Sequence, residues 1–252
     1  MVSVRTKELF EEDLTDETRV RRYGDYALDK TLNMLNDARE RINRKFSEYG
    51  LEPVDFPDFV AVENIEPSYA VLPIGNRLYT LPIGHVEGYY NPDKDLIAIN
   101  RASIPGTEEN ERLLNIYTDA LRKVDYLIAE FPSIRRPLKK LRRFYATAIY
   151  NLRQPRDDFV VHELVHKYQN QEGFLKKVRD TPVIEGITTA VTNEICGRQT
   201  TPEYTTYSAY NIRAYKAARE FGKDPIYLMY YVVTGKIPGS KLREAFYKSS
   251  LN

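Results

Sequence analysis

The sequence contains one cysteine, Cys196, no tryptophan and only three histidines among its 252 residues. A single cysteine excludes an internal disulfide and is typical of a reducing compartment, so we expect a cytoplasmic protein. No segment approaches the ~18 consecutive apolar residues that a membrane-spanning helix needs. The first residues also lack the apolar stretch of a signal peptide. We therefore expect no membrane association.

Neither sign of charge dominates the sequence. Lys and Arg total 37 and Asp and Glu total 36, which gives a formal net charge of +1. A protein that binds a polyanion normally carries a clear basic excess, so nucleic-acid binding is disfavoured. The exception is a local basic run: Arg135, Arg136, Lys139, Lys140, Arg142 and Arg143. We interpret this run as the solvent-facing side of an amphipathic helix; the alternative is a surface that binds nucleic acid or an acidic partner.

What the sequence does contain indicates a folded domain. Hydrophobic residues make up 42% and charged residues 29%, which is ordinary for a globular protein. The length suits a single compact unit over residues 1–252. The alternative is an N-terminal helical segment at 1–50 followed by a core at 51–252, because a helix predicted over 15–49 ends before Gly50.

Hydrophobic patterning divides the chain into three regions. Before Gly50 apolar residues recur every three or four positions, which favours the long helix. Short β-prone runs punctuated by Pro and Gly follow, at 59–65, 69–74, 77–81, 85–90 and 96–100. The remainder predicts helices at 108–129, 134–152, 157–172, about 181–196, 206–221, 225–233 and 240–249. The predicted fold class is therefore α+β, with a mainly helical C-terminal half.

Two of the three histidines lie in the segment His162-Glu163-Leu164-Val165-His166, which is an H-E-x-x-H motif. On a helix, positions i and i+4 share one face, so both imidazoles can bind one Zn²⁺. Glu163 can then act as general base on a metal-bound water. Only about three in a thousand random rearrangements of this composition would contain the motif. The plain alternative is a pair of ordinary histidines on a half-buried helix.

A catalytic zinc site needs a third protein ligand, and Glu185 is the best candidate. It lies in the first turns of the next predicted helix, within the otherwise apolar segment Pro182–Ala190. A carboxylate among apolar residues requires a partner, which a metal ion provides. Glu172 lies off the histidine face by helical geometry, and Glu194 points to the face opposite Glu185. Cys196 is on a suitable face but three turns away, so we expect it in the core.

These residues resemble the gluzincin class of zinc metallopeptidases. The resemblance rests on HELVH followed by a helix carrying Glu185-Gly186, and more weakly on a hairpin-like segment from Gly88 to Ile99. It implies a zincin-like fold: a small mixed β-sheet whose edge strand lies over the cleft, packed on the active-site helix. It implies His162, His166 and Glu185 as zinc ligands and Glu163 as general base. The implied activity is hydrolysis of peptide bonds.

The sequence departs from that class in two places. Thermolysin-like members carry an aspartate four residues after the ligand glutamate, where this chain has Thr189, so the group that orients a histidine is unidentified. The aminopeptidase segment that captures the substrate amine is absent, which argues against a simple aminopeptidase. The donor to the oxyanion is also open. Tyr207, which opens a helix after a loop, is the first candidate, and His85 is the alternative.

The sequence therefore predicts a zinc-dependent peptidase that acts on a peptide or protein substrate. Two alternatives stay open. The first is an inactive zincin fold used as a binding module. The second is a regulator that binds nucleic acid or another partner through the basic helix at 135–143. The oligomeric state is not predictable from these residues.

Overall fold

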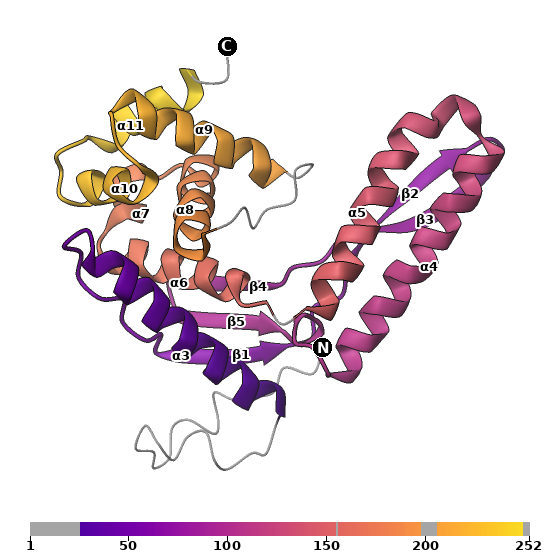
Figure 1. Ribbon diagram of the computed structural model, residues 1–252, viewed down its shortest axis with the longest axis horizontal. Helices are drawn as coiled ribbons and strands as arrows, with labels where there is room; N and C mark the ends of the chain where they lie inside the picture. The colour runs from indigo at the N-terminus through magenta and orange to yellow at the C-terminus, as the bar shows by residue number, and fades with distance from the viewer. Residues whose placement is uncertain (1–25, 155, 198–205, 249–252) are drawn as a thin grey trace. The chain divides into compact units, whose positions relative to one another are not determined.

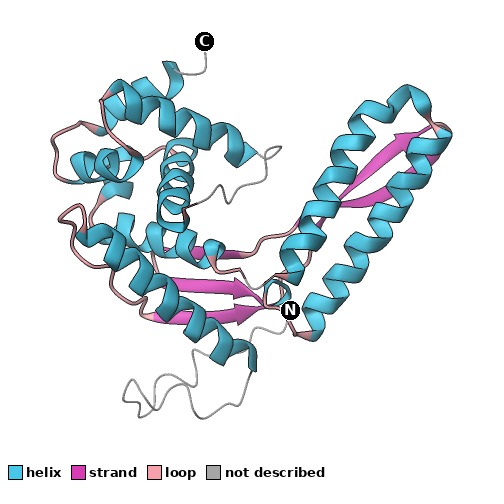
Figure 2. Ribbon diagram, in the orientation of Figure 1, coloured by secondary structure: helices cyan, strands magenta, loops and turns pink. Residues whose placement is uncertain are grey.

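The structure is a computed structural model, which describes residues 26–154, 156–197 and 206–248 (Figure 1). Its strands are β1 (Phe59–Glu63), β2 (Ser68–Ile74), β3 (Arg77–Gly84), β4 (Gly88–Asn91) and β5 (Leu96–Asn100). Its α-helices are α3 (Tyr26–Ser47), α4 (Glu108–Glu130), α5 (Arg135–Arg153), α6 (Asp158–Gln171), α7 (Phe174–Val178), α8 (Thr181–Cys196), α9 (Thr206–Glu220), α10 (Pro225–Val233) and α11 (Gly239–Lys248). Short 3-10 helices cover Arg101–Ser103 and Pro132–Ile134. Strands and helices together confirm the α+β class (Figure 2).

Contacts group the chain into two compact units that interleave along the sequence. Unit 1 comprises Met1–Asn33, Val60–Tyr89 and Ala98–Arg156, and unit 2 comprises Met34–Phe59, Tyr90–Ile97 and Asp157–Asn252. Gly50 lies inside one segment of unit 2. The prediction of one unit over 1–252, or of a division at residue 50, stays a prediction.

Unit 1 is built on an antiparallel hairpin of β2 and β3, which packs with helices α4 and α5. In the hairpin Ile74 pairs with Arg77 and Ala70 pairs with Leu81, so alternate residues share a face. Ile74 and Leu81 are buried with apolar residues of the two helices, including Tyr117 and Tyr145, in one core cluster. Tyr145 also donates a hydrogen bond from its hydroxyl to the Pro82 carbonyl at 2.7 Å, which ties α5 to β3.

The remaining strands form a second sheet in the order β1-β5-β4, so β4 is at its edge. A four-residue turn joins β4 to β5, in agreement with the predicted hairpin. Within the part of the chain that the structure describes, the strands thus form two sheets, where we predicted a single mixed sheet. The hairpin of β2 and β3 separates because its apolar face is already covered by α4 and α5.

In unit 2 the metal-motif helix α6 is held by buried apolar residues on several sides. Residues 159, 160, 161, 164 and 165 are all buried, as their sequence suggested. Phe46 of α3 packs its ring against Tyr168 of α6, with ring centroids 4.6 Å apart. Leu35, Ala38, Ile42 and Phe46 form the fully buried stripe of α3, which confirms this part of the predicted apolar stripe. The predicted helical residues 15–25 lie outside the described part of the chain.

Helix ends follow the local signals read from the sequence. Asp180 accepts a hydrogen bond from the Val183 amide at the start of α8, and Gly197 ends that helix with a φ of 64°. Asp157 precedes α6 but makes no capping bond, because its carboxylate pairs with Arg41 of α3 instead. Helix α7 was not predicted, since five residues give no periodic signal.

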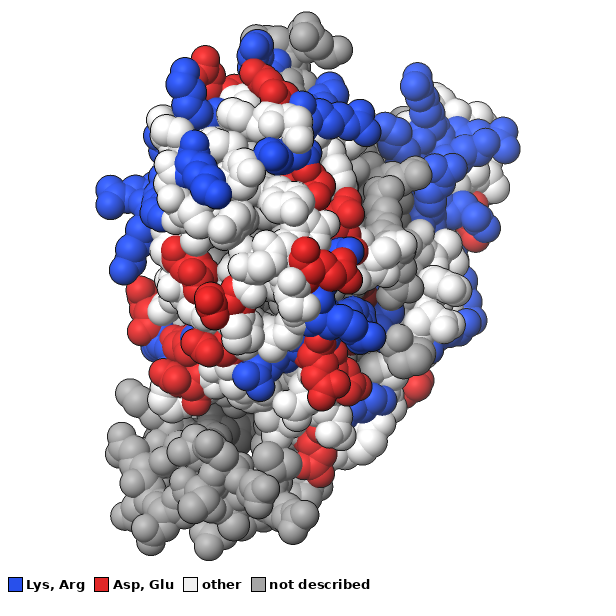
Figure 3. Space-filling model, turned by 60° about the vertical axis from the view of Figure 1, so that its left-hand side comes forward, with Lys and Arg blue, Asp and Glu red and all other residues white. Residues whose placement is uncertain are grey.

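The predicted amphipathic character of the basic helix α5 is confirmed. Leu138, Tyr145 and Ile149 are buried, while the six Lys and Arg side chains of the run 135–143 are exposed. Arg142 pairs with Asp125 at 2.7 Å. Figure 3 shows Lys and Arg side chains gathered at the upper right of that view. None of the described helices combines the length and apolar character needed to cross a bilayer.

Candidate metal centre

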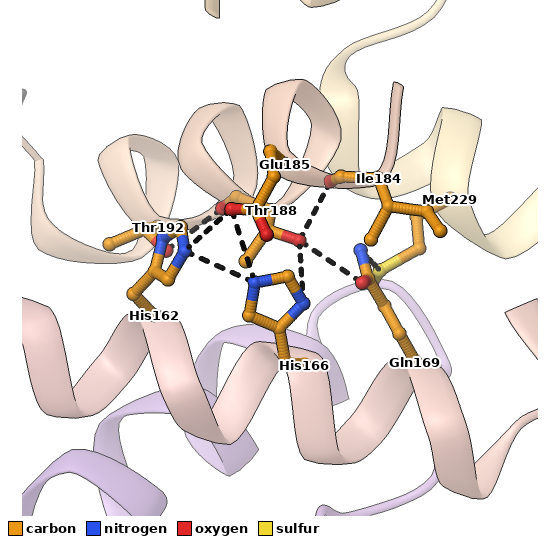
Figure 4. Close-up of polar contacts among 8 residues, drawn as sticks. All are labelled: His162, His166, Gln169, Ile184, Glu185, Thr188, Thr192 and Met229. Atoms are coloured by element: carbon orange, nitrogen blue, oxygen red, sulfur yellow. Dashed lines mark hydrogen bonds and ion pairs between the residues drawn. The ribbon is translucent and has the colours of Figure 1, made fainter. Parts of the chain in front are cut away.

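Two neighbouring helices of unit 2 supply the candidate site. His162 and His166 lie one turn apart on α6, and Glu185 lies on α8, with the three side chains directed toward one another (Figure 4). Each of them is mostly but not fully buried, with side-chain exposures of 20%, 12% and 20%. The site is thus partly accessible to water, as a site that admits a substrate must be.

The three ligand atoms form a nearly equilateral triangle. The two histidine Nε2 atoms are 3.1 Å apart, and Glu185 Oε2 is 3.3 Å from His162 Nε2 and 3.4 Å from His166 Nε2. A tetrahedral Zn²⁺ with bonds of about 2.0–2.1 Å would hold its ligand atoms about 3.3–3.4 Å apart. Glu185 therefore lies where the sequence predicted it, and the three residues form a group that could bind a metal ion.

The electrostatics of Glu185 favour its charged form. Burial raises the pKa of this carboxyl, but hydrogen bonds and charge interactions with His162 and His166 outweigh burial and hold the pKa far below its usual value. The carboxylate is therefore available as an anionic ligand at neutral pH. Two imidazoles and one carboxylate are a donor set that zinc enzymes use.

A buried threonine lies behind one of the histidines. Thr188 Oγ1 is 3.4 Å from His166 Nδ1, and the same hydroxyl donates to the Ile184 carbonyl at 2.8 Å or to Gln169 Oε1 at 3.0 Å (Figure 4). Since the hydroxyl proton is used in this way, the hydroxyl oxygen accepts a hydrogen bond from His166 Nδ1–H. That tautomer leaves the Nε2 lone pair directed at the centre of the triangle.

This contact makes Thr188 a candidate for the orienting group that the sequence left open. The neighbouring Thr189, which stands where thermolysin-like enzymes carry an aspartate, has a buried hydroxyl without a hydrogen-bond partner among the described residues. Thr188 takes the position because it lies three residues after Glu185, on the same face of α8. Helical spacing from Glu185 was therefore the signal that could have found it.

Glu163 is buried next to His162 on α6. Only 8% of the residue is exposed. Burial raises the pKa of its carboxyl, while the charges of the two histidines act in the opposite direction. Farther along α6, Asn170 Nδ2 donates a hydrogen bond to the hydroxyl of Tyr90, a residue of β4, at 3.0 Å. No local pattern relates these two segments, and sequence reasoning did not find this contact.

The positions of the two candidate oxyanion donors relative to the site are not described. Tyr207 lies in α9, but its side chain is outside the described part of the structure. His85 belongs to unit 1, where its Nδ1 is 2.9 Å from the hydroxyl of the buried Tyr117. The role of either residue stays a prediction.

The residues set aside as ligands have other surroundings. Glu172 follows the end of α6 and is not part of the metal-binding group. Glu194 accepts a hydrogen bond from the Tyr215 hydroxyl at 2.7 Å. Cys196 is half-buried near Arg41, not in the core as we expected, because α8 ends there. Burial raises the pKa of its thiol to about 11, so it is a poor metal ligand at neutral pH.

Gly186 allows α9 and α11 to approach α8 closely. A Cβ at this position would lie 2.8 Å from the Tyr210 carbonyl oxygen of α9 and 2.7 Å from the Phe246 ring of α11. The side of α8 that carries Gly186 therefore packs against α9 and α11, while Glu185 and Thr188 face α6.

No family model, curated protein or solved structure matches this chain.

Proposed function

We propose that this chain is a zinc-dependent peptidase of the gluzincin type, with a zincin-like arrangement of β4, α6 and α8. The observation that carries the proposal is the convergence of His162, His166 and Glu185 at mutual distances of 3.1–3.4 Å, with the buried Glu163 next to His162 in the chain. Three protein ligands would leave a fourth position for water, which distinguishes a catalytic zinc site from a structural one.

The side chains divide the work as follows. When bound, Zn²⁺ would polarise a water molecule and the scissile carbonyl of a peptide. His162, His166 and Glu185 would hold the ion, and the Thr188 hydroxyl would keep His166 in the ligand tautomer. Glu163 takes a proton from the water and later passes it to the leaving amine. A donor such as Tyr207 or His85 would stabilise the oxyanion.

The test combines metal content with hydrolysis. Purified protein loaded with Zn²⁺ is expected to bind one ion per chain and to cleave members of a mixture of unstructured peptides, detected by mass spectrometry. The positions of the cuts show whether the enzyme is an endo- or an exopeptidase. Glu163→Gln is expected to keep the ion and to lose about 10²–10⁴-fold in rate, the usual contribution of a general base.

The matched control is Glu172→Gln, which changes a glutamate just beyond the same helix and outside the triangle. It is expected to behave as the wild type in both assays. A protein that binds no stoichiometric Zn²⁺, or a Glu163→Gln variant as active as the wild type, would remove the peptidase proposal.

The alternatives give different outcomes in the same experiments. An inactive binding module would show no cleavage even with the metal bound. A regulator acting through α5 would bind DNA with an affinity that falls steeply as salt rises. The near-zero net charge gives no support to that alternative. Cytoplasmic location stays a prediction.

A further inference from the structure

A glutamine of α6 is fully buried and has no part in the proposed reaction. Gln169 lies three residues after His166 and has no exposed surface. Burying an amide costs free energy unless hydrogen bonds inside the protein replace its contacts with water, and a glutamine amide has both donors and an acceptor to satisfy. The partners that Gln169 finds therefore indicate what it does.

Those partners belong to two other helices of unit 2. Gln169 Oε1 accepts a hydrogen bond from the Thr188 hydroxyl of α8 at 3.0 Å, and Gln169 Nε2 lies 3.9 Å from the sulfur of Met229 in α10 (Figure 4). Met229 is also without exposed surface. Sulfur is a weak acceptor, so this contact contributes little free energy. It does give the amide N–H groups a partner on the side away from Thr188, which leaves Oε1 to face the hydroxyl.

The Thr188 hydroxyl has one proton and three possible acceptors. The Ile184 carbonyl lies at 2.8 Å, Gln169 Oε1 at 3.0 Å and His166 Nδ1 at 3.4 Å from the hydroxyl oxygen. If the proton went to His166 Nδ1, the neutral imidazole would carry its own proton on Nε2, the atom that faces the triangle. Ile184 and Gln169 both draw the hydroxyl proton away from that nitrogen.

Gln169 differs from Ile184 in the helix that it belongs to. The Ile184 carbonyl is part of α8 itself, whereas Gln169 reaches Thr188 from α6, the helix that carries His166. Residues three apart on a helix share a face, so His166 and Gln169 approach the hydroxyl from the same side. The amide thus holds the Thr188 oxygen where it can accept the hydrogen bond from His166 Nδ1–H.

We propose that Gln169 is a positioning residue that acts on His166 through the Thr188 hydroxyl. Its meaning for the metal centre rests on the proposed function, but its contact with Thr188 does not. Since Gln169 has no exposed surface, it cannot touch a substrate. Loss of its amide is therefore expected to weaken zinc binding, and to do so only while Thr188 is present to transmit the effect.

The first experiment tests the contact in the metal-free protein. The free energy of unfolding is measured by urea denaturation for Gln169→Leu, Thr188→Val and the double variant. The double variant is expected to lose less stability than the sum of the two single losses, because either substitution alone already removes the contact. The matched control is Gln171→Leu on the same helix, whose amide donates to the Pro53 carbonyl. Its loss should add to that of Thr188→Val.

The second experiment measures zinc affinity in the same variants by competition with a chelator. Gln169→Leu is expected to lower the affinity by about tenfold, the low end of the range for groups that support a metal-binding histidine. In the Thr188→Val background the same substitution should change the affinity by less than about twofold, because the intermediary is gone. Gln171→Leu should leave the affinity unchanged. Gln169→Met, whose unbranched side chain adapts to buried positions, replaces Gln169→Leu if that variant folds poorly.

A spectroscopic measurement follows the histidine directly. In the zinc-loaded protein, exchange of the His166 Nδ1 proton with water is measured by NMR. Gln169→Leu is expected to accelerate this exchange by about tenfold or more, because the acceptor of the proton is held less firmly. Gln171→Leu should not change it. An exchange rate that is the same in Gln169→Leu and in the wild type would overturn the positioning role.

The outcomes separate Gln169 from the peptidase proposal. Additive losses of stability in Gln169→Leu and Thr188→Val would overturn the link between the two residues, whether or not the protein hydrolyses peptides. An equal loss of zinc affinity with and without Thr188 would show a general structural role and overturn the positioning assignment. Coupled losses of stability and of zinc affinity in a protein that cleaves no peptide would support the positioning role and count against the peptidase.

Discussion

At the scale of single residues, two adjacent threonines of α8 differ in a way that mutation can expose. Thr188 contacts His166, while the buried hydroxyl of Thr189 has no partner among the described residues. Thr188→Val keeps the shape of the side chain but removes the acceptor for His166 Nδ1. It is expected to weaken zinc binding by about 10–100-fold, the usual effect of losing a group that orients a metal-binding histidine. Competition with a chromophoric chelator measures the affinity.

Thr189→Val is the control at the neighbouring position. It removes a hydroxyl that is buried without compensation, so zinc affinity should be unchanged and the free energy of unfolding equal to or above that of the wild type. If both variants lowered zinc affinity equally, the specific role of Thr188 would be wrong.

Much of the candidate site could be predicted from the sequence alone, but the residues that contact and position its side chains could not. His162, His166 and Glu185 followed from a motif, a helical face and an acid in an apolar segment, and the structure brings them together. Thr188 was missed because the expectation followed the spacing of a known class. The Asp95–Lys167 pair was missed because it joins residues 72 positions apart in sequence, which no local pattern relates.

At the scale of elements, the packing of α8 against α9 depends on the absence of a side chain at Gly186. Gly186→Ala would place a Cβ 2.8 Å from a backbone oxygen of α9 and 2.7 Å from the Phe246 ring, and the backbone cannot move aside without shifting the helix. We expect a loss of about 1–3 kcal/mol in the free energy of unfolding, the usual cost of overpacking. Urea denaturation followed by circular dichroism measures the loss.

The matched control is Gly84→Ala in β3. A Cβ there would meet nothing within 4 Å, so the free energy of unfolding should change little. Equal effects of the two substitutions would show that Gly186 matters for backbone flexibility and not for helix approach.

Elements were predicted well where caps and periodicity agreed. Helix α8 begins after Asp180 with Pro182 in its first turn and ends before Gly197, as the local chemistry of these residues favours. The division of the strands into two sheets was not predictable in this way, because pairing between strands depends on which apolar face the helices cover. The exposed side of α5 was predicted correctly, because the apolar residues of this helix form one buried stripe and the basic run lies outside it.

At the scale of the whole molecule, acid stability should depend on Asp95. Burial raises the pKa of this carboxyl, but hydrogen bonds from Lys167, Tyr90 and the Asp58 amide outweigh it and lower the pKa below its ordinary value of 3.8. A group with a lowered folded-state pKa contributes stability above its unfolded pKa and loses it as the pH falls through the folded pKa. Asp95→Asn should therefore be less stable than the wild type at pH 7, and the difference should shrink as the pH falls below about 4.

Denaturant unfolding at a series of pH values checks this expectation. Asparagine tolerates the positive φ of 45° at position 95, so backbone strain does not confuse the comparison. Asp93→Asn, at an exposed position in the same turn, is the control and should show no such convergence. A difference between Asp95→Asn and the wild type that stayed constant with pH would contradict the account.

Metal binding should also stabilise the whole molecule. A ligand that binds only the folded chain raises its stability by about 2.7 kcal/mol when present at 100 times its Kd. Zn²⁺ is therefore expected to raise the Tm of the wild type and a chelator to lower it again. Glu185→Gln, which removes the anionic ligand, should show a much smaller shift in a thermal melt, whereas Glu163→Gln should respond as the wild type.

The most direct test of the central claim is X-ray absorption at the zinc edge, on protein loaded with one equivalent of Zn²⁺. The account predicts a nitrogen and oxygen shell at about 2.0–2.1 Å containing two imidazoles, with no sulfur ligand. It also predicts that one imidazole signal disappears in His162→Ala and in His166→Ala. Failure to retain the ion, a sulfur shell at about 2.3 Å, or a spectrum unaffected by either substitution would contradict the assignment of the metal centre.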